Sequence, residues 1–260
     1  MPELADVEGY RRRLAEALPG RTVRKVTVRD PQVLRDTTAQ GLGRVLSGRT
    51  LDAPDRHGKW LFLRAEGEPA AVLHFGMTGR PEVCATEIER HPHDRLVLEL
   101  DGGPEFRFRM SRKLGGVWRA RSAAEQRAVT GPQGPDALTL DEHGLRVALA
   151  GRRGGLKAAL MDQAVIAGLG NLLADETCWR AGLDPRRPVR DLDDDALRSL
   201  HRSFRWVLPR AADAGRVPCR RGWLTGVRDD DEPACPRRAT PLERGTVAGR
   251  GTWWCPACQS

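Results

Sequence analysis

Three cysteines near the end of the chain have the spacing of a metal-binding hairpin. Cys255 and Cys258 form a CxxC knuckle, and Cys235 precedes the knuckle by twenty residues. Thiolates at such spacing hold Zn²⁺ in four-coordinate sites, but Arg238 stands where a second CxxC would place its other cysteine. Cys219 could supply a fourth sulfur, although its spacing is unusual. Three interpretations stay open: a zinc-binding hairpin, a metal-free hairpin of the same shape, and a redox-active CxxC.

The first residues of the chain could carry nucleophilic chemistry. Removal of Met1 would leave Pro2 with a free secondary amine, and α-amino groups have a pKa of about 8. Such an amine attacks a carbon that carries a leaving group and yields an iminium ion. Glu3, next in the chain, could then act as a general acid or base. The same residues are also typical of a plain helix start with proline in the first turn, so both interpretations stay open.

A glycine turn separates two helical segments in the second half of the chain. Gly168 and Gly170 flank Leu169, and Asn171 is predicted to be the N-cap of a helix over residues 172–180. Free backbone N–H groups at the start of such a helix favour an anion such as phosphate. The alternative is simple packing of two helices, with the glycines allowing a close backbone approach.

Composition narrows the class of protein and of partner. The 260 residues carry a net charge of +8, and residues 201–260 hold eleven Arg, no Lys and six acidic residues, a net charge of +5. This balance favours an anionic partner. No apolar run approaches the roughly 20 residues of a membrane helix, and no apolar region typical of a signal peptide follows Met1. Six cysteines are too few for a disulfide scaffold, so we expect a cytoplasmic protein with no membrane partner. No HExxH motif occurs, which disfavours a zinc hydrolase of that class.

Hydrophobic periodicity predicts an α+β chain. Apolar residues at steps of three and four predict a helix over residues 3–18. Alternating or compact apolar runs predict strands around residues 26–28, 60–63, 71–73, 96–100 and 106–110. A polar connection over 120–150 is expected to lead to helices from 156, over 172–180 and over 192–208, followed by a hairpin turn over 246–252. The expected domains are a β-sandwich with an N-terminal helix (1–125), a helical domain (126–215) and a hairpin tail (216–260).

Five motifs, in order along nearly the whole chain, resemble the formamidopyrimidine-DNA glycosylase and endonuclease VIII family. They are Met1–Glu8, His57–Leu61, Leu73–Gly79, Gly168–Glu176 and Gly249–Gln259. The resemblance implies an N-terminal helix on a β-sandwich, then a helix-two-turn-helix domain that ends in a zinc-finger-like hairpin. It also implies a monomer in the bacterial cytoplasm, associated with the nucleoid, whose partner is double-stranded DNA containing a damaged base or an abasic site.

The same resemblance implies a role for individual residues. Pro2 would attack C1′ of the damaged nucleotide and hold the sugar as a Schiff base, and Glu3 would open the sugar and shuttle protons. Lys59, one of only four lysines, would contact phosphate and assist β-elimination. Arg250 would grip the flanking phosphates in δ-elimination. The implied DNA contacts are Met77, His93, Arg112, Arg153, Asn171 and Arg250. Met77 and Arg112 would fill the gap that an extruded nucleotide leaves.

Three departures from the family pattern affect these expectations. Leu114 stands where the family commonly has an aromatic wedge, Arg238 removes a metal ligand, and the segment between Gly215 and Cys235 is short. An oxidised pyrimidine, an abasic site or another bulky lesion is therefore as good a substrate candidate as 8-oxoguanine. The expected function is a bifunctional DNA glycosylase and abasic-site lyase. The alternative is a catalytically impaired protein that binds damaged DNA on the same scaffold.

Overall fold

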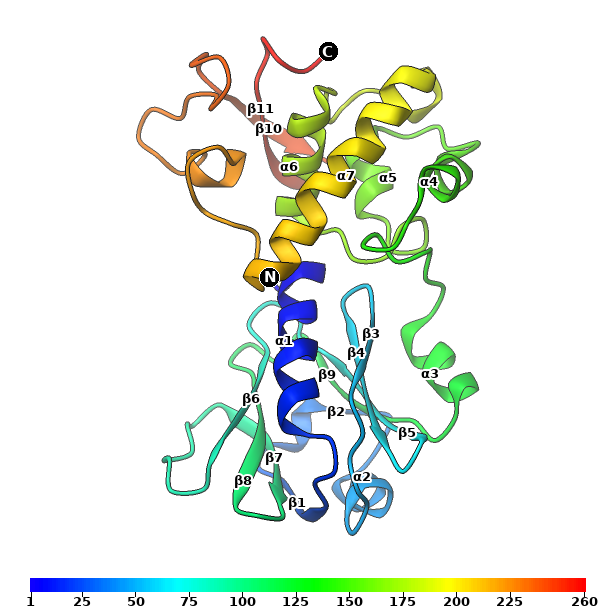
Figure 1. Cartoon of the computed structure of the whole chain (residues 1–260), viewed down its shortest axis with the longest axis vertical. Coiled ribbons are helices and arrows are strands. Elements are labelled where there is room, and N and C mark those ends of the chain that lie inside the picture. Colours follow the sequence, from blue (N-terminus) through cyan, green and yellow to red (C-terminus); the bar gives the residue numbers. More distant parts are fainter. The chain divides into compact units, whose positions relative to one another are not determined.

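The computed structural model describes residues 1–260, which form two compact units. Unit 1 comprises Met1–Pro2 and Val7–Gly131, and unit 2 comprises Glu3–Asp6 and Pro132–Ser260. Neither unit contains a helix that combines the length and the apolar character of a membrane span. The predicted fold class is confirmed, with an N-terminal helix, two sheets, a helical region and a cysteine-bearing hairpin (Figure 1). The three-way domain division stays a prediction; residues 216–260 belong to the same unit as residues 132–215.

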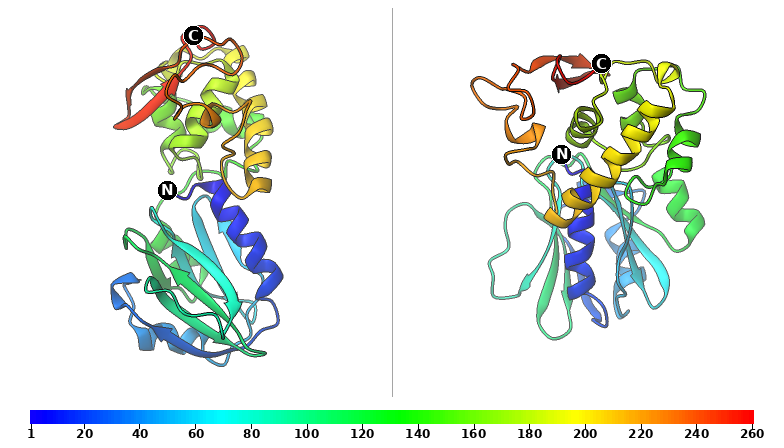
Figure 2. Two further views of the ribbon diagram at one scale, coloured as in Figure 1. Left: turned by 90° about the vertical axis from the view of Figure 1, so that its left-hand side faces the viewer. Right: turned by 45° about the horizontal axis from the view of Figure 1, so that its top comes forward.

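Unit 1 consists of two sheets beside the helix α1 (Leu4–Ala17), whose first three residues belong to unit 2 (Figures 1 and 2). The four-stranded sheet has the order β1-β7-β8-β6: Val23–Val28, Asp94–Leu100, Pro104–Arg109 and Arg80–Ala85. The five-stranded sheet has the order β2-β9-β5-β4-β3: Leu34–Arg35, Gly116–Arg119, Glu68–His74, Trp60–Ala65 and Asp55–His57. The remaining elements are η1 (Pro31–Val33), α2 (Ala39–Leu46) and α3 (Ala123–Thr130).

The core of unit 1 follows from two hydrophobic periodicities in the sequence, the helical one of α1 and the alternating one of the strands. Leu14 and Leu18 lie one helical turn apart along the α1 segment and are buried in the same cluster as the inward residues of the sheets. On β7 and β8 the apolar residues alternate, and Leu98 pairs with Phe106 across the strands. Each such side chain contributes about 1.5–3 kcal/mol when fully buried. The predicted helix and the predicted strands of this half are confirmed.

Unit 2 is a helical bundle with a two-stranded hairpin (Figure 2). Its helices are α4 (Glu142–Leu149), α5 (Leu156–Met161), α6 (Asn171–Ala181) and α7 (Asp194–Ala214), with the short turns η2 (Val189–Asp191) and η3 (Leu224–Gly226). The hairpin strands are β10 (Glu243–Val247) and β11 (Arg250–Trp254). Helix α6 is central, because α5, α7, η3 and β11 all pack against it.

The prediction of a polar connection over residues 120–150 is wrong, because the two helices α3 and α4 form there. Asp141 caps α4 by accepting the N–H of Gly144 at 2.7 Å, and Leu145 and Leu149 are buried on one side of the helix. These two leucines, four residues apart, are a helical signal that the neighbouring proline and glycine residues obscured. Helix α3 has no buried residue, so hydrophobic periodicity could not have revealed it.

The predicted helix over residues 192–208 begins correctly but ends too early. Asp193 caps α7 by accepting the N–H of Ala196 at 2.8 Å, and the helix continues through Pro209 to Ala214. Ala211 and Ala212 are buried in this last part, which explains why packing outweighs the usual tendency of proline to interrupt a helix. Gly215 then ends the helix in the left-handed conformation with φ +63°.

Candidate functional site

Glu3 lies at the start of α6, and both belong to unit 2. Its carboxylate accepts the backbone N–H groups of Gly170 at 3.0 Å, Leu172 at 2.8 Å and Leu173 at 3.0 Å. The side chain is 2% exposed. A residue near the start of the chain, distant in sequence, therefore satisfies three of the N–H groups at the beginning of this helix.

Two predictions about this helix start are corrected by that geometry. Asn171 is not the N-cap, because Gly170 holds the cap position and makes no side-chain capping bond. The anion that occupies the N–H groups is the carboxylate of Glu3 rather than a phosphate. The glycines serve the same arrangement, since a Cβ atom on Gly170 would overlap the Glu3 carboxyl group and one on Gly168 would overlap Leu4.

Asn171 and Arg250 lie next to each other through the hairpin of unit 2. The Asn171 Nδ2 donates to the backbone oxygen of Gly251 at 3.1 Å, and its Oδ1 is buried without a partner. Ala248 and Gly249, both with positive φ, form the two-residue turn that joins β10 to β11. Arg250 follows the turn and is exposed. The structure thus brings these two predicted DNA contacts together.

A fully buried lysine fastens the hairpin to α6. The Lys157 Nζ lies 2.7 Å from Asp175 Oδ1, donates to Thr252 Oγ1 at 2.6 Å and contacts the Gly251 oxygen at 3.4 Å. Thr252 Oγ1 in turn donates to the backbone oxygen of Arg250 at 2.9 Å. Burial raises the pKa of Asp175 to about 6 against the opposing charge of Lys157, so the carboxylate is ionised at neutral pH. Sequence analysis missed this network, although the scarcity of lysine was a signal for it.

In unit 1, the loops that carry Met77 and Arg112 are joined by one hydroxyl group. Thr78 Oγ1 accepts the Arg112 N–H at 3.2 Å and lies 3.0 Å from Ser111 Oγ, which donates to it. Met77 is 41% exposed and Leu114 is 58% exposed. The side chains of Met77 and Leu114 are therefore both accessible to a partner.

Glycines let the same two loops approach backbone to backbone. Gly76 has φ +55°, and a Cβ atom there would overlap the backbone of Leu114 and Gly115. A Cβ atom on Gly115 would overlap the His74 oxygen. His74 Nδ1 accepts the Gly76 N–H at 3.3 Å, and burial together with the charge of Lys59 lowers the pKa of His74 to about 4. The imidazole is therefore neutral at pH 7 and can keep this acceptor role.

The loop over residues 86–93, which carries His93, rests on buried charges of unit 1. Arg107 is 0% exposed and donates to the backbone oxygens of Ile88 and Glu89 at 2.6 and 3.1 Å. Asp94 accepts the His91 N–H at 2.8 Å. Arg107 sits on the strand face that alternates with Phe106 and Phe108, where sequence alone indicates exposure to water. A buried guanidinium requires such partners, so it holds this loop in place.

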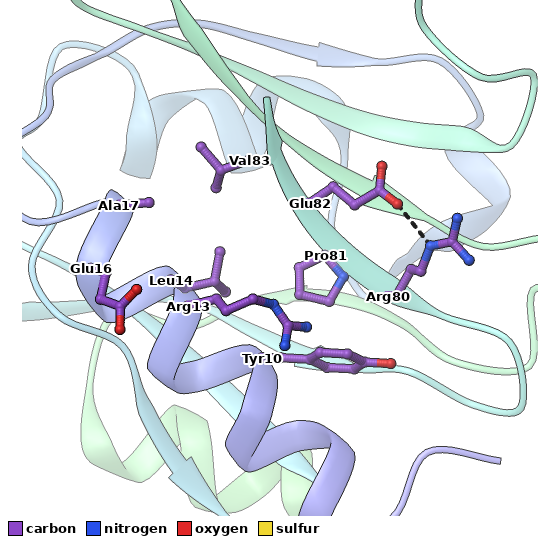
Figure 3. Close-up of a pocket in the computed structure, with 9 residues that line it drawn as sticks. All are labelled: Tyr10, Arg13, Leu14, Glu16, Ala17, Arg80, Pro81, Glu82 and Val83. Carbon is purple, nitrogen blue, oxygen red and sulfur yellow. Dashed lines mark hydrogen bonds and ion pairs between the residues drawn. The ribbon is translucent and has the colours of Figure 1, made fainter. Parts of the chain in front are cut away.

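The other predicted site residues occupy separate places. Lys59 lies in the two-residue turn between β3 and β4 of unit 1 and is half-buried, as is Pro2. Arg153 is exposed in the loop after α4 of unit 2, where it lines a cavity of about 460 Å³ together with Arg152 and Arg190. A second cavity, of about 490 Å³, lies between α1 and β6 of unit 1 and contains none of the predicted site residues (Figure 3).

Three of the four candidate metal ligands come together in unit 2. The Sγ atoms of Cys235, Cys255 and Cys258 all lie within 4.8 Å of one another. Cys219 is not part of this group, and its Sγ donates to the Thr225 oxygen at 3.4 Å. The tail nevertheless ends in the predicted hairpin, whose knuckle carries two of the three clustered thiols.

Glu176 is a buried carboxyl group that sequence analysis did not identify. It is 0% exposed, and its Oε2 accepts the Thr225 N–H at 3.3 Å while its Oε1 lies 3.6 Å from the Arg180 guanidinium. Burial raises the pKa of Glu176 to about 7, against the lowering effect of these partners. The group therefore changes its charge in the neutral range.

Glu176→Gln is expected to flatten the pH dependence of stability between pH 5 and 8. The raised pKa means that the folded state holds the proton more tightly than the unfolded state. The stabilising contribution is complete below the unfolded pKa and is lost as pH rises to about 7, an effect on the order of 3 kcal/mol. Urea unfolding at several pH values measures it. Glu142→Gln, which removes a carboxylate on α4 that is 42% exposed and paired with Arg146, is the control, and an unchanged slope in Glu176→Gln would contradict the prediction.

Two family models match the chain over most of its length. The model for the formamidopyrimidine-DNA glycosylase N-terminal domain matches residues 1–117, and the model for the formamidopyrimidine-DNA glycosylase H2TH domain matches residues 133–220. The first match covers most of unit 1. The second covers α4 to α7, including α6, which begins at Asn171, and it confirms the predicted helix-two-turn-helix domain.

Full-length relatives and solved structures agree with these matches. The formamidopyrimidine-DNA glycosylases of Laribacter hongkongensis and Thermus thermophilus are each 36% identical over 100% of this chain, covering 100% and 98% of their own lengths. The Lactococcus lactis Fpg has been solved in complex with DNA containing an abasic site and with DNA containing FAPY-dG. Each structure aligns with a TM-score of 0.88 at 25% identity over 99% of both chains. The chain belongs to the formamidopyrimidine-DNA glycosylase family.

Proposed function

We propose that this protein is a bifunctional DNA glycosylase and abasic-site lyase that removes a damaged base in base excision repair. The observation that carries the proposal is the buried Glu3 carboxylate, fixed by three backbone N–H groups at the start of α6. An acid held by the backbone keeps its position through a proton-transfer cycle. Pro2, the proposed nucleophile, precedes it directly in the chain.

The proposed reaction begins once Met1 has been removed from Pro2. The amine attacks C1′ of the damaged nucleotide, the bond from C1′ to the base breaks, and the base leaves with a proton. Glu3 protonates the ring oxygen as the sugar opens, and the nitrogen and C1′ are left joined as an iminium ion. Loss of a C2′ proton then expels the 3′ phosphate, with Lys59 contacting a phosphate during this β-elimination. Water finally hydrolyses the iminium and regenerates the amine.

The proposed partner is double-stranded DNA that contains a damaged base or an abasic site, as in the complexes of the Lactococcus lactis relative. Met77 and Arg112 would fill the space of an extruded nucleotide, for which their joined loops are suited. His93, Arg153, Asn171 and Arg250 would contact the backbone, with Arg250 also gripping the phosphates in δ-elimination. Because phosphate contacts dominate such binding, affinity is expected to fall with salt.

The three clustered thiols supply three of the four ligands that a closed site for a thiophilic divalent ion needs. Cys235, Cys255 and Cys258 are soft donors of the kind that Zn²⁺ binds, whereas a closed site needs a fourth ligand. A bound ion would tie Cys235 to the knuckle of Cys255 and Cys258 and so stabilise the hairpin that carries Arg250. We assign it no part in the reaction.

Borohydride trapping tests the proposed function. Incubation of the wild-type protein with abasic-site DNA and borohydride is expected to give a covalent complex, because reduction makes the iminium irreversible. Pro2→Gly is expected to weaken the trapping, since glycine supplies a primary amine of different geometry. Intact mass must first establish that Met1 is absent from the preparation. Binding without any trapped complex, from protein that lacks Met1, would refute the lyase proposal and favour the catalytically impaired alternative.

A further inference from the structure

Residues 235–239 keep the backbone of a metal-binding knuckle although one ligand has been replaced. The Cys235 oxygen accepts the N–H groups of Arg238 at 3.3 Å and Ala239 at 2.8 Å. The Cys255 oxygen accepts those of Cys258 at 3.2 Å and of the following glutamine at 3.1 Å. Position 238 is therefore the geometric counterpart of position 258. Ala239 adopts the left-handed conformation, with φ +53°, which a residue with a side chain seldom adopts.

The three sulfur atoms lie close together, and one of them accepts an N–H donor. Cys235 and Cys255 are buried, and the Sγ atoms of Cys235 and Cys258 lie 3.6 Å apart. The Trp179 indole Nε1–H donates to Cys235 Sγ at 3.4 Å. A donor aimed at sulfur favours the charged form, and the thiolate is the form that binds metals.

No side chain of this protein completes the cluster. Among all His, Cys, Asp and Glu side chains, only the three cysteines gather at this place. The Arg238 side chain is exposed, and a guanidinium does not give up its proton to become a ligand. Cys219 is engaged elsewhere, with the Thr225 oxygen. Position 238, the backbone counterpart of Cys258, therefore offers no ligand.

We propose that Cys235, Cys255 and Cys258 form a three-thiolate site for a thiophilic divalent cation, with a fourth coordination position that is open to an exchangeable ligand from solvent. Closed sites with four protein ligands are structural, whereas three protein ligands leave a position for water or an added ligand. The ligand class that suits this position is a small thiol or imidazole, because both are good donors to such ions. The inference is independent of the Pro2 chemistry, since neither needs the other.

Cobalt substitution of the reduced full-length protein tests the open position. Co²⁺ is expected to bind at one ion per chain and to give thiolate-to-metal charge-transfer absorption. Addition of 2-mercaptoethanol or imidazole is expected to shift the visible d–d bands of the wild-type complex, because a new ligand enters the fourth position. Failure of the reduced protein to bind Co²⁺ or Zn²⁺ would overturn the proposal. Binding with a spectrum that ignores both added ligands would also overturn it, because the site would then be closed.

Arg238→Cys is the matched variant, since it restores a thiol at the geometric counterpart of Cys258. Its cobalt spectrum is expected not to respond to added thiol. Its affinity should rise at least about tenfold, because loss of an outer partner alone costs about 10–100-fold in metal affinity. A spectrum that responds like the wild type, or an unchanged affinity, would contradict the assignment of position 238.

Two further variants distinguish a cysteine that is proposed to bind the metal from one that is not. Cys258→Ser is expected to lose the charge-transfer absorption, with circular dichroism as the check that the protein is folded. Cys219→Ser is expected to leave the cobalt spectrum and its response to added thiol unchanged. Loss of metal binding in Cys219→Ser would show that Cys219 is the fourth ligand and would overturn the open position.

Discussion

Glu3→Gln is expected to abolish base release from a lesion duplex while the protein still forms a trapped complex with a pre-formed abasic site. The glutamine amide cannot donate the proton that opens the sugar, and general acid–base catalysis contributes about 10²–10⁴-fold to a rate. Its NH₂ group would also face one of the three backbone N–H groups that the carboxylate now accepts. Each unsatisfied buried N–H costs about 1–3 kcal/mol, so the start of α6 should loosen as well.

Single-turnover base release on a panel of defined lesion duplexes measures the catalytic effect, and thermal unfolding measures the structural one. Asp6→Asn is the matched control, because Asp6 is the neighbouring acid and its Oδ2 accepts the Glu3 N–H at 2.9 Å. We expect this control to release base at a rate much closer to that of the wild type. Normal base release by Glu3→Gln would show that Glu3 is only a helix cap. The same panel identifies which base is released and which base must lie opposite.

Lys157→Met is expected to destabilise unit 2 and to release the hairpin that carries Arg250. The substitution removes the nearest partner of the buried Asp175 carboxylate, at 2.7 Å, and leaves Arg228, at 3.5 Å, as its ion-pair partner. Breaking a buried ion pair costs about 3–5 kcal/mol, and we expect a loss near the lower end of this range because Arg228 remains. It also removes the donor to Thr252 and thereby loosens the backbone next to Arg250. Urea unfolding measures the first effect, and limited proteolysis of the hairpin measures the second.

Two comparisons make the lysine prediction specific. Lys25→Met removes an exposed lysine whose nearest acid, Glu99, lies at 3.9 Å, and exposed pairs of this kind contribute about 0–1 kcal/mol. The double variant Lys157→Met with Asp175→Leu removes both buried charges and is expected to recover part of the lost stability. A Lys157→Met protein as stable as the wild type would mean that the pair does not hold the hairpin.

The parts of the fold that repeat a local pattern could be predicted from the sequence, and long-range contacts could not. The helix beginning near Leu4 and the alternating strand with Phe106 and Phe108 follow from periodicity alone. Periodicity could not indicate that Arg107, on the opposite face of that strand, is buried beneath the loop over residues 86–93. Burial of a charge depends on partners that are distant in sequence, and one chain read alone does not identify them.

The candidate site shows the same division. Sequence motifs identify Glu3 and Asn171 as candidates, but local capping rules predict Asn171 as the N-cap of α6, whereas Gly170 holds that position. The group that accepts the N–H groups at this helix start is the carboxylate of Glu3, which lies 170 positions from Leu173 in the sequence. In the sequence, Lys157 is simply one of four lysines, and its pairing with Asp175 is visible only in the packed structure. Local chemistry identifies candidate residues, whereas packing decides which atoms they meet.

The burial of Lys157 has a practical consequence for following motion in this protein. Lys25 has 67% of its side chain exposed and Lys113 has 30%, whereas Lys157 has none. An amine-directed reagent therefore reaches Lys157 only in molecules in which the hairpin has separated from α6 or a larger part of unit 2 has opened. Peptide mass spectrometry of such a labelling time course would measure this opening as the labelling rate of Lys157. The labelling rates of Lys25 and Lys113 would serve as references for the reactivity of the reagent. The experiment would need neither a mutation nor an attached probe.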